Sequence, residues 1–195
     1  MTSAGDKRTR VASPPPSAAP GATEETHVLV PEKDITVSLS ITDRPLDIAR
    51  LYELAVHEAC GAVSSFVGIT RETFEGKTVL RLEYEAYVPM ALSHMKRLAQ
   101  VAAERFPGCR RFVIAHRTGL VPVTEASVVI HVGSAHRRDG LLAVAYVIDE
   151  LKATVPIWKK EIYSPSSSPS GNPDDAAAWK ANREFTSRHI TAPSS

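Results

Sequence analysis

The sequence is poor in aromatic residues and carries almost no net charge. Phe, Trp and Tyr make up 6% of its 195 residues, and 23 Lys and Arg nearly balance 22 Asp and Glu, for a formal net charge of +1. RNA-binding domains usually present a broad basic face with stacking aromatics, so this composition argues against a nucleic-acid ligand. No apolar run approaches the roughly 18 residues that a membrane-spanning helix needs, so we also expect no membrane span.

Cysteine is scarce as well. Cys60 and Cys109 are too few for a disulfide framework or a Cys-based zinc site, and each stands beside a glycine at the boundary of a predicted element, which favours a packing role. The seven histidines come with no HExxH motif and no cluster of carboxylates. We therefore predict no metal site and no bound cofactor.

Length and composition predict one globular domain with a sizeable core. Residues 1–26 are rich in Pro, Ala, Ser and Gly, which predicts a disordered tail, and they lack the apolar segment of a secretory signal. We expect residues 27–163 to form the folded domain, residues 164–195 to form a flexible Ser/Pro segment with a short helix, and the protein to be cytosolic.

The hydrophobic pattern alternates between the periods of strands and helices. The resulting order, β-α-β-β-α-β-β-α-β, does not fit regular βαβ winding and predicts an α+β fold, with helices packed on a mainly antiparallel or mixed sheet. We expect strands at Asp34–Ser40, Ala62–Ile69, Thr78–Ala86, Arg111–Arg117, Ser127–Val132 and Ile157–Tyr163, and helices at Pro45–Ala59, Met90–Phe106 and Arg138–Val155.

Positive charge is concentrated around the last of these helices. A small loop, Gly133-Ser134-Ala135, follows an apolar strand and places His136, Arg137 and Arg138 where the helix starts. Unpaired backbone N–H groups and the helix dipole already favour an anion at that position. The pattern is typical of a phosphate or carboxylate site.

A lysine interrupts the apolar stripe predicted for the same helix. Leu141, Ala145, Ile148, Lys152 and Val155 are spaced 4, 3, 4 and 3 residues apart, which is the period of a buried helix face. A long lysine side chain can reach solvent from such a position. Alternatively, it faces a cavity, where it can serve as a base, a nucleophile or an anion anchor.

The strand after this helix carries a second basic pair. Strand alternation places Lys159, Glu161 and Tyr163 on one face and Lys160 on the other. Lys152 and Lys159 can then converge on one pocket.

Several separated motifs resemble the large, catalytic subunit of molybdopterin synthase. SAHR ends at Arg137, a helix ending in LK follows at Lys152, and VPIWKKE ends at Glu161. GITR at Gly68 to Arg71 and EYEAYVPMA at Glu83 to Ala91 fit the same family. The resemblance covers roughly Ile35 to Tyr163, with the motifs in the family order.

This resemblance implies an α/β hammerhead-like fold and makes residues 27–163 the catalytic domain. It implies a sulfurtransferase of molybdenum cofactor biosynthesis, which inserts two sulfurs into cyclic pyranopterin monophosphate. The sulfur donor is then a ubiquitin-like small subunit with a C-terminal Gly-Gly thiocarboxylate, so no cysteine of this chain is needed. The family forms a central homodimer with a small subunit at each outer end, a heterotetramer.

The resemblance also assigns site residues. Lys152 is the expected catalytic group, as general acid/base or as the cation that polarises the thiocarboxylate, while Lys159 is expected to anchor a phosphate or an oxyanion. Phe66 and Ile148 match pocket walls, and Arg183 follows a linker that departs from the family pattern. The expected substrate-binding residues are Ile69, Thr70, Arg71, His136, Arg137, Lys152, Lys159, Lys160, Glu161 and Arg183.

Two further considerations bear on the function. The predicted helix separates Arg137 from Lys152 by roughly 20 Å, so a small pterin cannot easily touch both, and we expect His136 and Arg137 to reach the site of a neighbouring subunit. Taken without the resemblance, the basic clusters also suit a non-catalytic module that binds an anion or a nucleotide.

Overall fold

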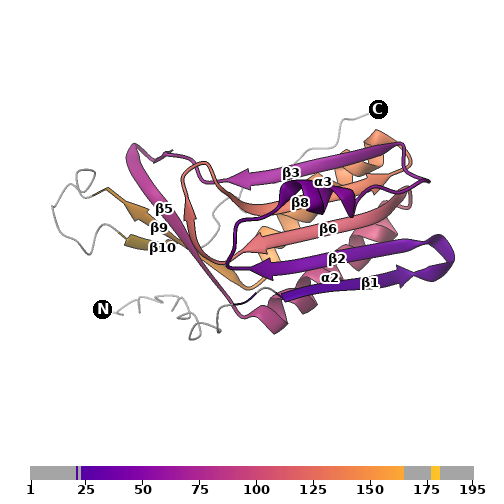
Figure 1. Ribbon diagram of the computed structural model, residues 1–195, viewed down its shortest axis with the longest axis horizontal. Helices are drawn as coiled ribbons and strands as arrows, with labels where there is room; N and C mark the ends of the chain where they lie inside the picture. Colours follow the sequence, from indigo (N-terminus) through magenta and orange to yellow (C-terminus); the bar gives the residue numbers. More distant parts are fainter. Residues whose placement is uncertain (1–20, 22, 165–176, 181–195) are drawn as a thin grey trace, which may run out of the picture.

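The computed structural model describes residues 21, 23–164 and 177–180. Its larger sheet has the strand order β1-β2-β6-β8-β3 (Figure 1). Strands β2 and β6 of this sheet pair in parallel, and all other neighbouring strands in it pair antiparallel. The larger sheet is therefore mixed. The bounds are Thr23–Val30 for β1, Ile35–Thr42 for β2, Ala62–Ile69 for β3, Cys109–Arg117 for β6 and Ala126–Ser134 for β8.

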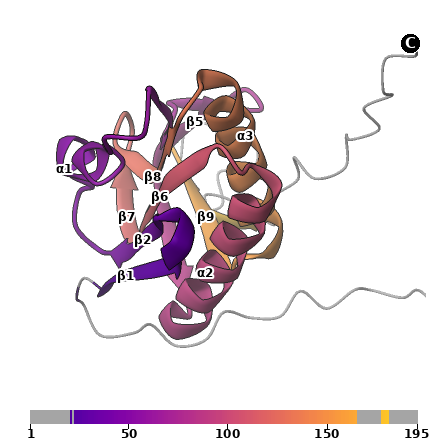
Figure 2. The same ribbon diagram turned by 90° about the vertical axis from the view of Figure 1, so that its right-hand side faces the viewer.

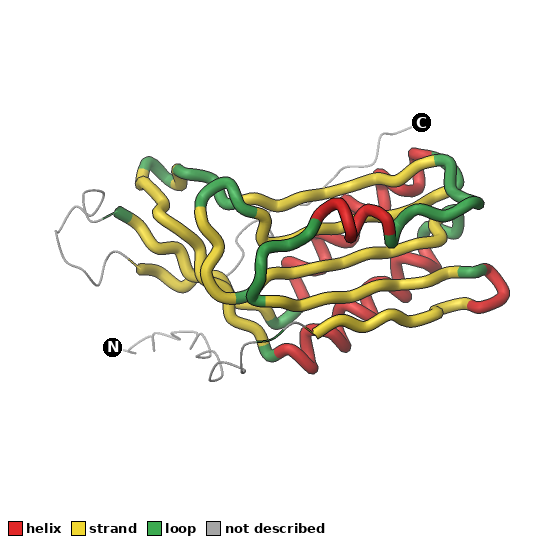
Figure 3. The backbone as a smooth tube through the Cα atoms, viewed as in Figure 1, coloured by secondary structure: helices red, strands yellow, loops and turns green. Residues whose placement is uncertain are grey.

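A smaller sheet lies across one end of the larger one (Figures 1 and 3). Its long central strand β5 pairs with β9, and β10 lies outside β9. The short strands β4 and β7 also pair with β5. The bounds are Thr73–Phe74 for β4, Lys77–Ala86 for β5, Gly119–Pro122 for β7, Ile157–Tyr163 for β9 and Ala177–Lys180 for β10.

Helices cover the two faces of the larger sheet unequally. The two 18-residue helices α2 (Val88–Arg105) and α3 (Arg137–Thr154) lie side by side on one face, while the short α1 (Ile48–Glu53) lies on the other (Figure 2). A 3-10 turn, Pro31–Lys33, joins β1 to β2. This arrangement confirms the predicted α+β class with a mixed sheet and packed helices.

The core forms between the larger sheet and the helix pair. Alternate residues of β2, from Ile35 to Ile41, are buried and pack with Met95 of α2, Phe112 of β6 and Ile130 of β8. Each such side chain contributes about 1.5–3 kcal/mol through removal of apolar surface from water. The period of 2 in the strands and the 3-4 spacing in α2 therefore bury one face of each element.

The helix predicted at Pro45–Ala59 is wrong in its bounds, because α1 covers only Ile48–Glu53. The Asp47 carboxylate accepts a hydrogen bond from the Arg50 backbone N–H at 3.0 Å and caps the helix start. Beyond Glu53 the chain continues in turns, and Leu54 and Val56 are exposed. Without an apolar face to bury there, tertiary packing does not extend the helix.

Four strands lie where the sequence predicts none. Strand β1 begins at Thr23, inside the tail predicted for residues 1–26, while β4 and β7 lie between predicted strands. Ala177–Lys180 belongs to the segment predicted as a short C-terminal helix, yet it forms β10. In each case the backbone of a neighbouring strand supplies the hydrogen bonds, which local composition does not reveal. The rest of both terminal segments falls outside the described residues.

The buried face of α3 is rotated relative to the predicted stripe. Leu141 and Ala145 are exposed, and Lys152 lies at the edge of the buried face. Gly140 explains the rotation, because a Cβ there would approach Ser134 Oγ to 2.6 Å, so only glycine lets the helix pack this closely on the strands. The buried residues of the helix are Gly140, Ala143, Val144, Val147, Ile148 and Leu151.

Candidate active site

A cavity of about 610 Å³ lies where the smaller sheet, the end of the larger sheet and the C-terminal part of α3 meet. Its volume is in the range of pockets that bind small molecules. Phe66 of β3 and Ile148 of α3 lie on its walls, and Trp158 of β9 adds an aromatic wall.

Lys152 and Lys159 both lie on this cavity, although one comes from a helix and the other from a strand. Lys159 Nζ lies 3.1 Å from the Glu161 carboxylate, whose side chain is only 3% exposed. The Tyr163 hydroxyl donates a hydrogen bond to the other oxygen of that carboxylate. Glu161 therefore fixes Lys159 at the cavity wall, on the strand face that alternation predicts.

Arg71 adds a third cationic side chain to the cavity. It lies two residues after the end of strand β3, and its guanidinium carbon lies 5.1 Å from the centroid of the Phe74 ring, a cation–π arrangement. Three cationic side chains on one partly enclosed surface favour an anionic ligand.

Neighbours of these residues play other parts. Ile69 lines the cavity, but Thr70 is buried away from it and holds the loop, because its backbone N–H donates to the Glu125 carbonyl at 3.0 Å. Lys160 is not among the residues that line the cavity. Arg183 lies outside the described residues.

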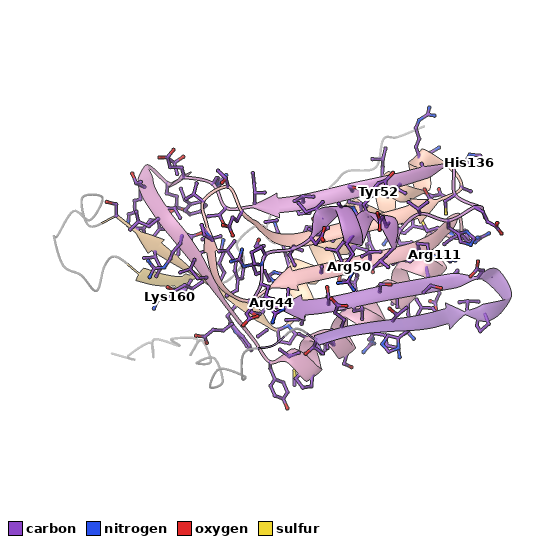
Figure 4. All side chains as sticks on the ribbon, viewed as in Figure 1. Arg44, Arg50, Tyr52, Arg111, His136 and Lys160 are labelled. Carbon is purple, nitrogen blue, oxygen red and sulfur yellow. The ribbon has the colours of Figure 1, made fainter. Side chains whose placement is uncertain are left out.

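His136 and Arg137 lie far from the cavity. His136 occupies the N-cap position of α3 without a side-chain capping hydrogen bond, Arg137 is the first helical residue, and both side chains are exposed. Figure 4 shows His136 at the opposite end of the molecule from Lys160. From Arg137 to Lys152 the helix rises about 22 Å at ~1.5 Å per residue. Within one chain the two predicted clusters are therefore not brought together.

Two titratable cavity residues were not among the predicted site residues. His116 and Tyr84 line the cavity, with ring centroids 5.0 Å apart in an edge-to-face arrangement. Burial lowers the pKa of His116 to about 4 and raises the pKa of Tyr84. The Tyr84 hydroxyl donates a hydrogen bond to Ser127 Oγ at 3.3 Å. Their signal in the sequence is weak, because a histidine on an apolar strand face looks like an ordinary core residue.

Neither the cysteines nor a metal cluster belongs to this cavity. Cys60 Sγ lies beside Gly133, near the start of α3, and burial raises the pKa of both thiols, that of Cys109 to about 12. Within the part of the chain that the structure describes, no three His, Cys, Asp or Glu residues are arranged to hold a metal ion. No helix among these residues is long and apolar enough to cross a membrane.

The fold and the cavity define an α+β protein with a small-molecule site that favours anions. The model of the family described as MoaE protein matches residues 41–154. The chain is 49% identical over 152 residues to the molybdopterin synthase catalytic subunit of Bos taurus, which covers 78% of this chain and 74% of that protein. The chain belongs to the MoaE family, which confirms the family predicted from the motifs.

Solved structures agree with this assignment. A crystal structure of molybdopterin synthase from Staphylococcus aureus matches with a TM-score of 0.65 and 34% identity, over 73% of this chain and 96% of that one. A complex of subunits 1 and 2 of molybdopterin-converting factor from Helicobacter pylori matches with a TM-score of 0.55 over 64% of this chain and 84% of that one. At 24% identity, the second likeness concerns the fold alone.

Proposed function

We propose that this chain is the catalytic subunit of a molybdopterin synthase, which inserts two sulfurs into a cyclic pyranopterin monophosphate. The names of its relatives support the predicted enzymatic role in molybdenum cofactor biosynthesis. The observation that carries the proposal is the cavity itself, where Arg71, Lys152 and Lys159 surround a space of about 610 Å³ beside aromatic walls. A flat heterocycle with a phosphate suits those surroundings.

The reaction explains why the cations are needed. Each transfer replaces a carbon–oxygen bond of the pterin side chain with a carbon–sulfur bond, and the displaced oxygen leaves as water or with the opened phosphate. The acyl–sulfur bond of a thiocarboxylate breaks in the same transfer, and its acyl carbon takes oxygen from water and leaves as a carboxylate. Negative charge develops on the acyl oxygen meanwhile, and a fixed ammonium group in a partly buried site stabilises it strongly. We assign this role to Lys152, with Lys159, held by Glu161, anchoring the phosphate or an oxyanion.

The substrate site is completed by a second copy of the chain. His136 and Arg137 are exposed about 22 Å along α3 from Lys152, so they cannot share a small ligand with it in one subunit. A two-fold dimer would bring this end of one chain to the cavity of the other and create two equivalent sites. The location of Lys160 off the cavity argues for a supporting role, although the resemblance assigns it to the substrate.

The sulfur donor in this proposal is a small ubiquitin-like subunit with a C-terminal Gly-Gly thiocarboxylate. The relatives are named catalytic subunits, which agrees with a second component. The mouth of the cavity, where the exposed Ile69 lies, offers an apolar entrance for an extended tail. The cytosolic location stays a prediction.

Reconstitution tests the function directly. Purified chain, thiocarboxylated small subunit and pterin monophosphate should yield the dithiolene product, detected by mass spectrometry. A small subunit ending in an ordinary carboxylate serves as the matched control and should yield none. Absence of product from the complete mixture, with all components shown to be folded, would contradict the proposal.

A further inference from the structure

A buried histidine stands between the core and the cavity. Along β6, Phe112, Ile114 and His116 alternate onto the same face, toward α2 and α3. The first two fill the hydrophobic core, whereas His116 lies at the end of the strand, where the core gives way to the cavity. An apolar residue would satisfy packing at that position, so the imidazole calls for an explanation.

The hydrogen bonds of His116 define its tautomer. Its Nδ1 lies 2.8 Å from the backbone carbonyl oxygen of Arg117. A carbonyl oxygen can only accept, so Nδ1 carries the proton and the neutral ring keeps an acceptor lone pair on Nε2. Nε2 is the ring nitrogen farther from the backbone, and His116 is one of the residues that line the cavity.

The ring is held so that this acceptor stays in place. The edge-to-face contact with Tyr84 fixes the imidazole plane, and the Tyr84 hydroxyl is itself tied to Ser127 Oγ. Burial keeps the pKa of His116 at about 4, so near neutral pH the ring adds no positive charge to the cavity. It is therefore unsuited to hold a phosphate, unlike Arg71 and Lys159.

We infer that His116 Nε2 accepts a hydrogen bond from an N–H group of the pterin ring system, while the cationic side chains hold the phosphate. This inference rests on the proposed function, because the pterin is its ligand. The cavity then has two chemically different parts: cations for the anionic group, and a neutral acceptor beside aromatic rings for the heterocycle. His116 would be a specificity-determining residue that touches substrate without carrying charge.

Two substitutions separate this role from a structural one. The amide nitrogen of His116→Asn can take the place of Nδ1 and keep the bond to the Arg117 carbonyl, but it offers no acceptor at the position of Nε2. The amide oxygen of His116→Gln can take the place of Nε2 and keep the acceptor, but it loses the Arg117 bond. Thermal melting of both variants, together with binding of inorganic phosphate, controls for folding and for the cationic groups.

Binding of pterin monophosphate to the purified chain, measured by calorimetry, gives the test. Loss of one hydrogen bond should raise Kd for the pterin about tenfold in His116→Asn, while His116→Gln stays within about threefold of wild type. Binding of inorganic phosphate should be unchanged in both variants. In a ligand-free sample, ¹⁵N NMR should report the Nδ1–H tautomer, and the Nε2 signal should shift when the pterin is added.

Other outcomes overturn the inference. Normal pterin binding in His116→Asn with weakened binding in His116→Gln would make the Arg117 bond, and hence structure, the only role. Weakened binding of the small subunit with unchanged pterin binding in His116→Asn would assign the acceptor to the partner's tail instead. If the wild-type chain failed to bind pterin monophosphate, the proposed function itself would be wrong. If the wild type bound the pterin and His116→Asn bound it equally well, only the inference about His116 would be wrong.

Discussion

The two ends of helix α3 carry basic residues in opposite physical settings. At its C-terminal end, Lys152 faces a cavity together with Lys159, which a buried carboxylate holds in place. At its N-terminal end, His136 and Arg137 are exposed on the surface of the described chain. Sequence motifs mark both ends equally, but only the first is a formed pocket within one chain. The contrast teaches that a basic motif can be half of a site that needs a second subunit.

The largest effect should come from the cavity end. Lys152→Ala should reduce turnover at least about 100-fold, because the cation beside the reacting group is removed. The melting temperature should change little, because Lys152 lies at the edge of the buried face. Lys152→Arg keeps the positive charge but cannot release a proton, so it should restore activity only as far as Lys152 acts as a cation and not as an acid/base. Product formation and thermal melting measure the two effects.

The exposed Lys33, in the 3-10 turn, provides the matched control. Lys33→Ala should leave turnover unchanged. Full activity in Lys152→Arg would reduce Lys152 to a point charge.

The two ends should also respond differently to acid. Burial holds the pKa of His116 near 4, against about 6.5 in the unfolded chain, so below pH 6.5 the unfolded state takes up a proton that the native state refuses. His116 should therefore cost up to about 3 kcal/mol of stability as pH falls from 6.5 to 4. Chemical denaturation across this range should show a shallower pH dependence for His116→Asn than for wild type.

The opposite end supplies the comparison. There His57 Nε2 lies 2.7 Å from the Asp34 carboxylate, and the hydrogen bond from Arg111 is the main cause that lowers the pKa of Asp34. A lowered carboxyl pKa gives stability that is lost as pH falls from about 5 through that pKa, so the acid response of Asp34 lies mostly below the range in which His116 responds. Equal slopes in wild type and His116→Asn would contradict the assignment of a buried neutral ring.

A smaller effect should reveal whether the two ends meet. Arg137→Ala and Lys152→Ala chains, each inactive alone, should regain activity when co-expressed, because a mixed dimer contains one fully wild-type site. Random pairing makes half of the dimers mixed, so about a quarter of wild-type activity is expected from symmetric two-site dimers. Mixed dimers that form, as native mass spectrometry can show, and remain inactive would refute a shared site.

The smallest effect should come from the cysteines, which lie toward the His136 end. Cys60→Ser with Cys109→Ser should retain turnover, because the sulfur is proposed to come from the partner and because burial raises the pKa of both thiols. Cys109 is fully buried, so a packing loss of about 1 kcal/mol should appear in denaturation. Loss of turnover in the folded double variant would favour a persulfide on this chain.

Local sequence patterns predicted an element best where the hydrophobic pattern of that element alone determines its bounds. Strands β3 and β9 have the predicted bounds, and α3 differs from its predicted range by one residue at each end. Patterns failed where pairing with another strand decides, as for β1, β7 and β10. The phase of α3 was wrong because apolar residues occur on two adjacent stripes, and packing of Gly140 selects one of them.

The site could be predicted in part for the same reason. Strand alternation alone places Lys159 with Glu161, and the motif resemblance brings in Arg71. His116 could not be found, because its neutral state and its acceptor depend on burial, on the Arg117 carbonyl and on Tyr84, which belongs to another strand. Such properties exist only after the chain has folded.

Helix α3 also limits how this chain can change over time. Insertion of a single residue near its middle would turn everything beyond it by about 100°, so Lys152 would swing off the cavity while His136 stayed where it was. Loops can lengthen at little thermodynamic cost, but helix α3 cannot. Helix α3 should therefore tolerate substitutions on its outer face but no net gain or loss of residues. Enlargement of the active site by design must then be made in the strands around the cavity.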